Sequence, residues 1–408
     1  MYIPKTEVAA RIAALKETME KKGVDAAILA RPENVFYYSA FNPILISHPA
    51  YVLVPLKGEP CLLVHSIRHD HARQEGAIDN VALFGKWGAN KALAADPFGA
   101  IKAILGDASL RLGIEGDYAS VNWMRDLGQA LLIGECVDLS HDIAMQKIVK
   151  DAWEIACCRK SGALVDAGVE RAIAALDAGA TEAEACTEGQ YRMRKMWHER
   201  FQDEEVSGFG SSENAQIDSL VVWSMANERI AFGCDCPRAY VPEKGDLVLP
   251  MAWARIAGYA VENERTVIVG EVSGTRAKAY DAMLKARERI FERLRPGETF
   301  ESLYLAAMDE YGKAGFGDIL PGRCGHGMGL STHEYPSVAK GNTIPLCPGM
   351  IFTVEPGLMT AAWGGVRHSD TVLITETGYE SLTGFRRDKI VIKGHEGSTT
   401  KESGASRP

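Results

Sequence analysis

Residues 323–336 read Arg-Cys-Gly-His-Gly-Met-Gly-Leu-Ser-Thr-His-Glu-Tyr-Pro, and three glycines alternate with other residues around His326. Glycine tolerates positive φ angles and allows the backbone to come close to a ligand. A stretch of this kind can hold one imidazole in a fixed orientation beside a cavity. His333 follows His326 by seven residues and supplies a second imidazole. The stretch therefore predicts a fold organised around a site that contains His326.

Three further motifs accompany this stretch. They are Gly-Asp-Leu-Val-Leu at 245–249, Val-Glu-Pro-Gly at 354–357, and Gly-Gly-Val-Arg at 364–367 followed by Asp-Thr-Val-Leu-Ile at 370–374. In this order they resemble the pita-bread hydrolases of peptidase family M24, which include creatinase, prolidase, aminopeptidase P and methionine aminopeptidase. The resemblance covers nearly the whole chain. It implies an α/β fold with a small amino-terminal creatinase-type domain and a carboxy-terminal pita-bread domain.

The length of the chain also favours two domains, because 408 residues are too many for one ordinary core. Alternating helical and strand-like segments predict an α/β domain over residues 1–145. The pita-bread domain is expected over residues 146–388, with a strand at 246–249 that pairs with residues 263–269. Residues 389–408, rich in Ser, Gly, Thr and Lys, are predicted to be a disordered tail.

Composition excludes several classes of partner. The formal net charge of −9 argues against nucleic acid. No window contains the apolar run that a membrane span needs, and the first residues lack the apolar core of a signal peptide. The cysteines are scattered without a C-x₂-C pair, as expected for reduced thiols in the cytoplasm. The sequence therefore predicts a cytoplasmic protein that acts on a small molecule.

The family resemblance raises the question of metal ions. The dinuclear peptidases of the family bind two ions through two aspartates, one histidine and two glutamates, and the paired ions activate a bridging hydroxide. Here His326 and Glu355 match the third and fourth ligands, and Glu262 stands at the second. Met251 and Ser369 stand at the first and fifth. Because a thioether and a hydroxyl replace two carboxylates, we expect no two-metal site and no bound metal.

Creatinase, a family member that hydrolyses a C–N bond without metal ions, suggests another interpretation. It grips a guanidinium group with two glutamates, whose positions here hold Glu264 and Glu355. Glu262 adds a third carboxylate, and carboxylates facing one site repel each other unless a cation lies between them. The sequence thus predicts a pocket for a cationic nitrogen group. The catalytic histidine of creatinase has no counterpart, since Cys234 stands near its position, and its carboxylate-binding arginine is also absent.

We assign predicted roles to seven residues. His326 is predicted to be the general acid or base, a role that imidazole commonly has near neutral pH. Glu355 and Glu264 are predicted to stabilise the cationic nitrogen of the substrate. Cys234 is either a thiolate nucleophile or a small apolar thiol in a loop, and Arg367 either binds a substrate carboxylate or pairs with a neighbouring strand. The predicted catalytic residues are His326, Glu355 and Glu264, and the predicted substrate-binding residues are His333, Glu262, Cys234 and Arg367.

The predicted function is metal-independent, creatinase-like hydrolysis of a non-peptide C–N bond in a small nitrogen-rich metabolite, such as an amidine, a guanidino compound or a cyclic amide. The expected assembly is a homodimer in which the partner's amino-terminal domain closes each site. Three alternatives stay open. Glu262, His326 and Glu355 could hold one divalent Mn, Fe or Zn ion in a mononuclear hydrolase or lyase. The chain could be an Xaa-Pro dipeptidase or aminopeptidase, or it could be a catalytically inactive binding homologue.

Overall fold

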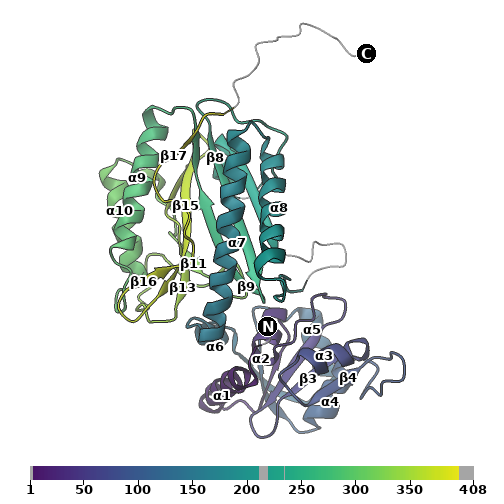
Figure 1. The fold of residues 1–408 in the computed structure, drawn as a ribbon. Coiled ribbons are helices and arrows are strands. Elements are labelled where there is room, and N and C mark those ends of the chain that lie inside the picture. The colour runs from purple at the N-terminus through teal and green to yellow at the C-terminus, as the bar shows by residue number, and fades with distance from the viewer. Residues whose placement is uncertain (1–2, 211–218, 234, 395–408) are drawn as a thin grey trace, which may run out of the picture.

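The computed structural model describes residues 3–210, 219–233 and 235–394. The chain forms a smaller amino-terminal domain and a larger carboxy-terminal domain, which meet near helix α6 (Figure 1). Each domain has its own mixed arrangement of helices and one sheet, so the predicted two-domain α/β fold is confirmed. Cys234 and residues 395–408 of the predicted tail lie outside the described residues.

The amino-terminal domain is built on a six-stranded sheet in the order β4-β3-β2-β1-β5-β6. Its first helix buries Val8, Ile12, Leu15 and Met19, whose spacing of three or four residues places them on one helix face. That helix ends at Gly23, where φ is 65°. The strands are β1 (Ala26–Leu29), β2 (Ala50–Pro55), β3 (Cys61–His65), β4 (Val81–Phe84), β5 (Leu110–Ile114) and β6 (Ile133–Asp138). The helices are α1 (Lys5–Lys22), α2 (Pro32–Ser39), η1 (Ser66–Arg68), α3 (His69–Glu75), α4 (Pro97–Leu105), α5 (Val121–Ala130) and α6 (Ser140–Lys147).

The carboxy-terminal domain is built on an eleven-stranded sheet. Its main path runs β12-β11-β13-β15-β9-β8-β10-β17, while β14 and β16 pair with β15 and β7 pairs with β8. The strands are β7 (Leu220–Ala226), β8 (Leu247–Ile256), β9 (Tyr259–Arg265), β10 (Val267–Val269), β11 (His326–Gly327), β12 (Glu334–Ser337), β13 (Ile351–Val354), β14 (Gly357–Thr360), β15 (Gly364–Ile374), β16 (Tyr379–Ser381) and β17 (Ile390–Ile392). The helices are α7 (Ala152–Asp177), α8 (Glu182–Arg200), η2 (Asn227–Phe232), α9 (Gly274–Phe291), α10 (Phe300–Lys313) and η3 (Gly317–Ile319).

Two helix pairs pack against this sheet (Figure 1). Helices α7 and α8 lie against β7, β8 and β9, while α9 and α10 form a second pair near β13 and β15. Both helices of the first pair begin with a capping box, Asp151 with Glu154 and Thr181 with Glu184, which satisfies backbone N–H groups at the helix start. This packing leaves the opposite face of the strands free to carry a site.

The β8–β9 hairpin is longer than the sequence indicates. We expected a strand at 246–249 only, but β8 runs from Leu247 to Ile256 and turns back through two residues. Those residues, Ala257 and Gly258, have φ angles of 48° and 82°, as a tight hairpin turn requires. Ala257 masks the turn in the sequence, because alanine seldom adopts positive φ. At the other end of the chain, β17 pairs with β10, so the sheet continues past residue 388.

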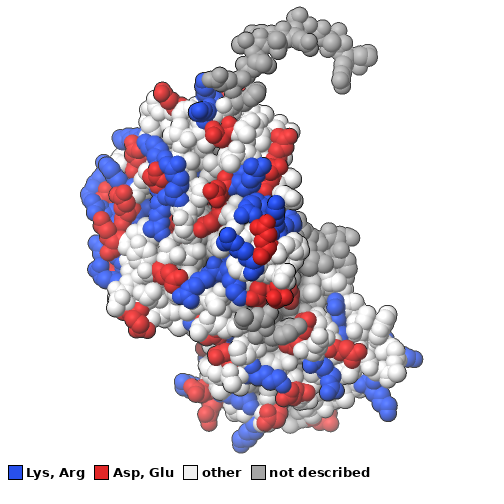
Figure 2. Space-filling model, in the orientation of Figure 1, with Lys and Arg blue, Asp and Glu red and all other residues white. Residues whose placement is uncertain are grey.

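The molecular surface has no single dominant charge on the face drawn in Figure 2, where acidic and basic side chains are interspersed over both domains. Among the described residues, no helix combines the length and the apolar character needed to cross a membrane.

A buried ion pair ties β12 to the segment that connects the domains. Glu334 lies 3.4 Å from the Lys150 ammonium and 3.9 Å from that of Lys147, and its side chain is 8% exposed. Burial alone would raise the pKa of Glu334, but Lys150 and Lys147, with the backbone N–H of Ser331, outweigh burial and lower it. A carboxyl group with a depressed pKa stabilises the folded state above its unfolded pKa, and this contribution is lost as the pH falls through the folded value.

We therefore expect Glu334→Gln to lower the free energy of unfolding by about 3 kcal/mol at pH 7, because it leaves buried ammonium groups without their anion. The difference from the unmodified protein should shrink as the pH falls below the ordinary Glu range and through the lowered pKa of Glu334, because the carboxylate of that protein then becomes protonated. Urea unfolding at several pH values measures both. Glu380→Gln, which removes the partner of Arg159 in an exposed pair, is the matched control and should cost little at any pH. A cost for Glu334→Gln that does not change with pH would contradict the electrostatic origin.

Candidate metal centre and active site

Strand alternation brings two of the predicted glutamates to one face of β9. Successive side chains of a strand point to opposite faces, so Glu262 and Glu264 share a face and Asn263 faces the other way. The Asn263 amide donates a hydrogen bond of 2.5 Å to Asp166 of α7, which identifies the second face as the helix-covered one. Glu262 and Glu264 therefore point to the face opposite α7, and both are buried.

The neighbouring strand β15 is divided in the same way. His368 contacts the Tyr280 hydroxyl of α9 at 3.1 Å, and Asp370 binds Arg287 of the same helix. Ser369 lies between them in the sequence and points to the site, where its hydroxyl donates a hydrogen bond of 2.6 Å to Glu262. Arg367 also faces the site and binds Glu264.

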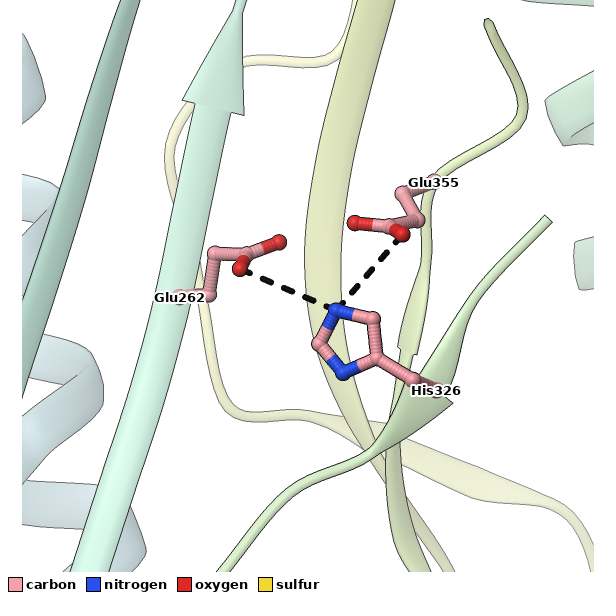
Figure 3. A group of neighbouring side chains, drawn as sticks. All are labelled: Glu262, His326 and Glu355. Carbon is pink, nitrogen blue, oxygen red and sulfur yellow. Dashed lines mark ion pairs between the residues drawn. The ribbon is translucent and has the colours of Figure 1, made fainter. Parts of the chain in front are cut away.

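His326 and Glu355 complete the site from β11 and from the residue that follows β13. Nε2 of His326 lies 3.5 Å from Oε1 of Glu355 and 3.9 Å from Oε2 of Glu262, so the imidazole stands between two carboxylates (Figure 3). Gly325 is required beside this histidine, because a Cβ atom there would come within 2.0 Å of the Thr353 carbonyl oxygen. The glycine-rich stretch thus holds the imidazole against the adjacent strand, as the sequence predicts.

The electrostatics of the group reflect this crowding. Burial would lower the pKa of His326, but Glu355 together with Glu262 raises it to about 9. Burial and then the nearby Glu355 raise the pKa of Glu262. For Glu355 the effect of burial is outweighed by His326, which lowers its pKa. One imidazolium group at His326 cannot neutralise both buried carboxylates, Glu262 and Glu355. A cation bound among the three side chains would relieve the repulsion between these carboxylates.

Glu262 is oriented by two hydrogen-bond donors. Ser369 donates to Oε1, and the indole N–H of Trp253 donates to Oε2 over 2.7 Å. Trp253 was missed by the sequence analysis, although it stands directly opposite Glu262 in the β8–β9 hairpin. The hairpin register would have identified it, had the turn at Ala257 been recognised. Donors of this kind fix a carboxylate for ligation and are typical around metal ligands.

The donor set fits one metal ion. Ligand atoms of Glu262, His326 and Glu355 all lie within 4.8 Å of one another. Nε2 of His326 is buried without a hydrogen-bond partner, while Nδ1 is 3.1 Å from the carbonyl oxygen of Gly327. If Nδ1 carries the proton that this carbonyl accepts, Nε2 keeps its lone pair for a metal. Two carboxylates and one imidazole suit divalent Mn, Fe or Zn.

The same site does not fit two ions. Met251 and Ser369, at the positions where the family resemblance places two more carboxylates, contribute a thioether and a hydroxyl. The sulfur of Met251 lies 3.4 Å from Nη2 of Arg367, and the Ser369 hydroxyl already donates to Glu262. Neither side chain supplies negative charge for a second divalent ion.

The structure brings together six of the seven residues predicted for the site. Glu264 binds the guanidinium group of Arg367 through both carboxylate oxygens, with a distance of 2.7 Å for Oε1. The ring of His333 lies 4.2 Å from that of His326, centroid to centroid, and is exposed. Cys234, the seventh, lies outside the described residues, so its predicted role stays a prediction.

A pocket of about 510 Å³ opens beside the group, and its wall includes Glu355, Arg367 and Arg323. This volume falls in the range of small-molecule sites. Arg323 adds an exposed guanidinium to the wall of the pocket. The pocket therefore lies beside the buried group of candidate ligands and is large enough for a dipeptide.

Comparison with known proteins identifies the family. Residues 156–376 match the model of metallopeptidase family M24, and residues 11–149 match the creatinase/prolidase N-terminal domain. The chain belongs to metallopeptidase family M24.

Its relatives include Xaa-Pro dipeptidases from Pyrococcus furiosus and Pyrococcus horikoshii. They are 28% and 29% identical over 382 and 383 residues, which are 93% of this chain in both cases and 99% and 98% of the relatives. The crystal structure of the prolidase from Pyrococcus horikoshii has a TM-score of 0.79 and 26% identity, and the match covers 93% of this chain and 100% of that one. The similarity therefore extends over both domains.

These comparisons correct the predicted function. The creatinase-like, metal-independent hydrolysis of a non-peptide C–N bond is wrong, because the relatives are named Xaa-Pro dipeptidase and prolidase, as one of the alternatives expected. The geometry supplies a physical reason. Glu264, which was expected to grip a substrate guanidinium, already holds the guanidinium of Arg367.

The predicted absence of a metal cofactor is wrong as well. The family is a metallopeptidase family, and Glu262, His326 and Glu355 offer ligand atoms that could hold a metal ion. The loss of two carboxylates argues against a pair of ions, but three ligands are enough to hold one, as the mononuclear alternative expects.

Proposed function

We propose that this protein hydrolyses short peptides, as a dipeptidase does, with one divalent ion held by Glu262, His326 and Glu355. The observation that carries the proposal is the buried Nε2 of His326, which has no hydrogen-bond partner and lies between the carboxylates of Glu262 and Glu355. The names of the relatives, Xaa-Pro dipeptidase and prolidase, support a peptide as the substrate. The pocket beside Glu355 supports a substrate of dipeptide size.

Several residues have separate proposed roles in the hydrolysis of the peptide bond. When bound, a divalent ion would polarise the scissile carbonyl group and lower the pKa of water next to it. Trp253 and Ser369 keep Glu262 in a fixed orientation, and the Gly327 carbonyl does so for the imidazole of His326. Glu355 borders the pocket, where its carboxylate can accept the proton that water releases on attacking the peptide carbonyl. Arg323 supplies positive charge for the free carboxylate of a dipeptide.

A dipeptide panel with controlled metal content tests this proposal. Chelator-treated protein, reloaded with Mn²⁺, Fe²⁺ or Zn²⁺, is assayed on dipeptides with and without a carboxy-terminal proline. We expect hydrolysis with at least one metal, no hydrolysis before reloading, and a loss of about 10²-fold or more in Glu355→Gln. Glu376→Gln removes an exposed carboxylate and is the matched control, with unchanged activity. Metal-loaded protein that cleaves none of the dipeptides would contradict the proposed substrate class and favour an inactive binding homologue.

The homodimeric assembly and the cytoplasmic location stay predictions of the sequence. Analytical ultracentrifugation of the full chain tests the first, since a homodimer has twice the chain mass of 44.4 kDa. Fractionation of the source cells tests the second.

A further inference from the structure

A fixed cation of the protein itself stands inside the candidate metal centre. The guanidinium group of Arg367 binds the carboxylate of Glu264 through Nε and Nη2, and its side chain is only 17% exposed. Nη2 also contacts the sulfur of Met251 at 3.4 Å. Two parallel hydrogen bonds give such a pair a defined geometry, so the positive charge has a fixed position.

The charges of the site balance with one divalent ion. Glu262, Glu264 and Glu355 bring three negative charges, and Arg367 returns one positive charge. A single divalent ion neutralises the remainder. A second divalent ion would leave two uncompensated positive charges among buried groups, which is strongly unfavourable because burial removes their hydration. Arg323, an exposed residue in the wall of the adjoining pocket, is basic and would add to that excess.

The neighbouring neutral side chains lead to the same conclusion. Met251 faces Glu264 across the hairpin, and its sulfur contacts the Arg367 guanidinium. Ser369 uses its hydroxyl as a donor to Glu262, whose carboxylate would hold the single ion. Met251 therefore contacts the guanidinium of Arg367, and Ser369 orients a ligand of the single ion.

We infer that Arg367 acts as the second cation of this site: held by Glu264 and Met251, its guanidinium replaces a second metal ion, and the protein takes up one divalent ion per chain. The inference rests on the proposed three-residue metal site and adds its stoichiometry and the role of Arg367. Arg367 thus contributes a fixed positive charge to the centre.

Metal binding measured without any activity assay tests the inference. Full-length protein is stripped with chelator and titrated with Mn²⁺ in a calorimeter, and bound metal is counted by mass spectrometry after gel filtration. We expect one ion per chain. Two ions would overturn the role of Arg367 but leave the proposed metal centre standing, whereas no bound ion would overturn the proposed metal centre and this inference with it.

Three variants test the inference further. Met251→Asp combined with Ser369→Glu adds two negative charges and should admit a second ion, while the matched neutral variant, Met251→Asn with Ser369→Gln, should still bind one. A folded acidic variant that binds only one ion would contradict the charge balance. Glu264→Gln frees the charge of Arg367 and should weaken binding of the single ion by about tenfold or more. Unchanged affinity in Glu264→Gln would overturn the inference, even if the double variant fails to fold.

Discussion

His326→Gln is expected to lower kcat/KM on the best dipeptide substrate by about 10²- to 10⁴-fold and to remove the bound ion. The reason is positional. Nε2 of His326 lies 3.5 Å and 3.9 Å from the carboxylates of Glu355 and Glu262, and it has no hydrogen-bond partner of its own. Glutamine fills a similar volume but offers a weaker, neutral amide donor atom. Steady-state kinetics and metal content by mass spectrometry measure the two losses.

His333→Gln is the matched control for metal content. Its ring lies 4.2 Å from that of His326, but it is exposed and outside the group of three ligands. We expect this variant to keep its ion, whatever its effect on substrate binding. The fold of His326→Gln should stay intact, as judged by circular dichroism, because β11 is held by its backbone and by Thr353. Undiminished turnover in His326→Gln would remove this histidine from the mechanism.

Short-range patterns in the sequence were enough to select His326 and Glu355 as candidate site residues. The glycines around His326 and the Glu-Pro-Gly segment at Glu355 act within a few residues, because a close backbone approach depends on local glycine. Two domains followed from the length of the chain, and the pita-bread fold followed from the family resemblance that the order of the motifs carries.

Contacts between distant segments were harder to predict. Glu264 and Arg367 are 103 residues apart, and their pairing depends on the register between β9 and β15, in which Ser369 stands opposite Glu264. A shift of one residue would turn Arg367 to the other face. Without this register, the sequence presents Glu264 as a free carboxylate that could bind a cationic substrate. The predicted creatinase-like function depended on that interpretation.

The largest loss of stability is expected at Asp370, whose side chain is fully buried on the helix side of β15. Oδ1 accepts hydrogen bonds from Arg265 at 2.7 Å and from the Thr383 hydroxyl at 3.1 Å, while Oδ2 pairs with Arg287. Asp370→Ala leaves these two buried guanidinium groups without their shared anion. Removing one partner of a buried ion pair costs about 3–5 kcal/mol, a large share of the ~5–15 kcal/mol that stabilises a domain.

Urea unfolding followed by tryptophan fluorescence measures this cost, and two variants isolate its origin. Asp370→Asn keeps the shape and part of the hydrogen bonding but removes the charge, so we expect a loss smaller than that of Asp370→Ala. Asp388→Ala removes the partner of Arg386, an exposed pair with side chains 64% and 54% exposed, and should cost little. Since Ser369 and Glu264 are held by the same strand pair, Asp370→Ala should also weaken metal binding. A stability of Asp370→Ala equal to that of Asp388→Ala would show that the two arginines find other partners.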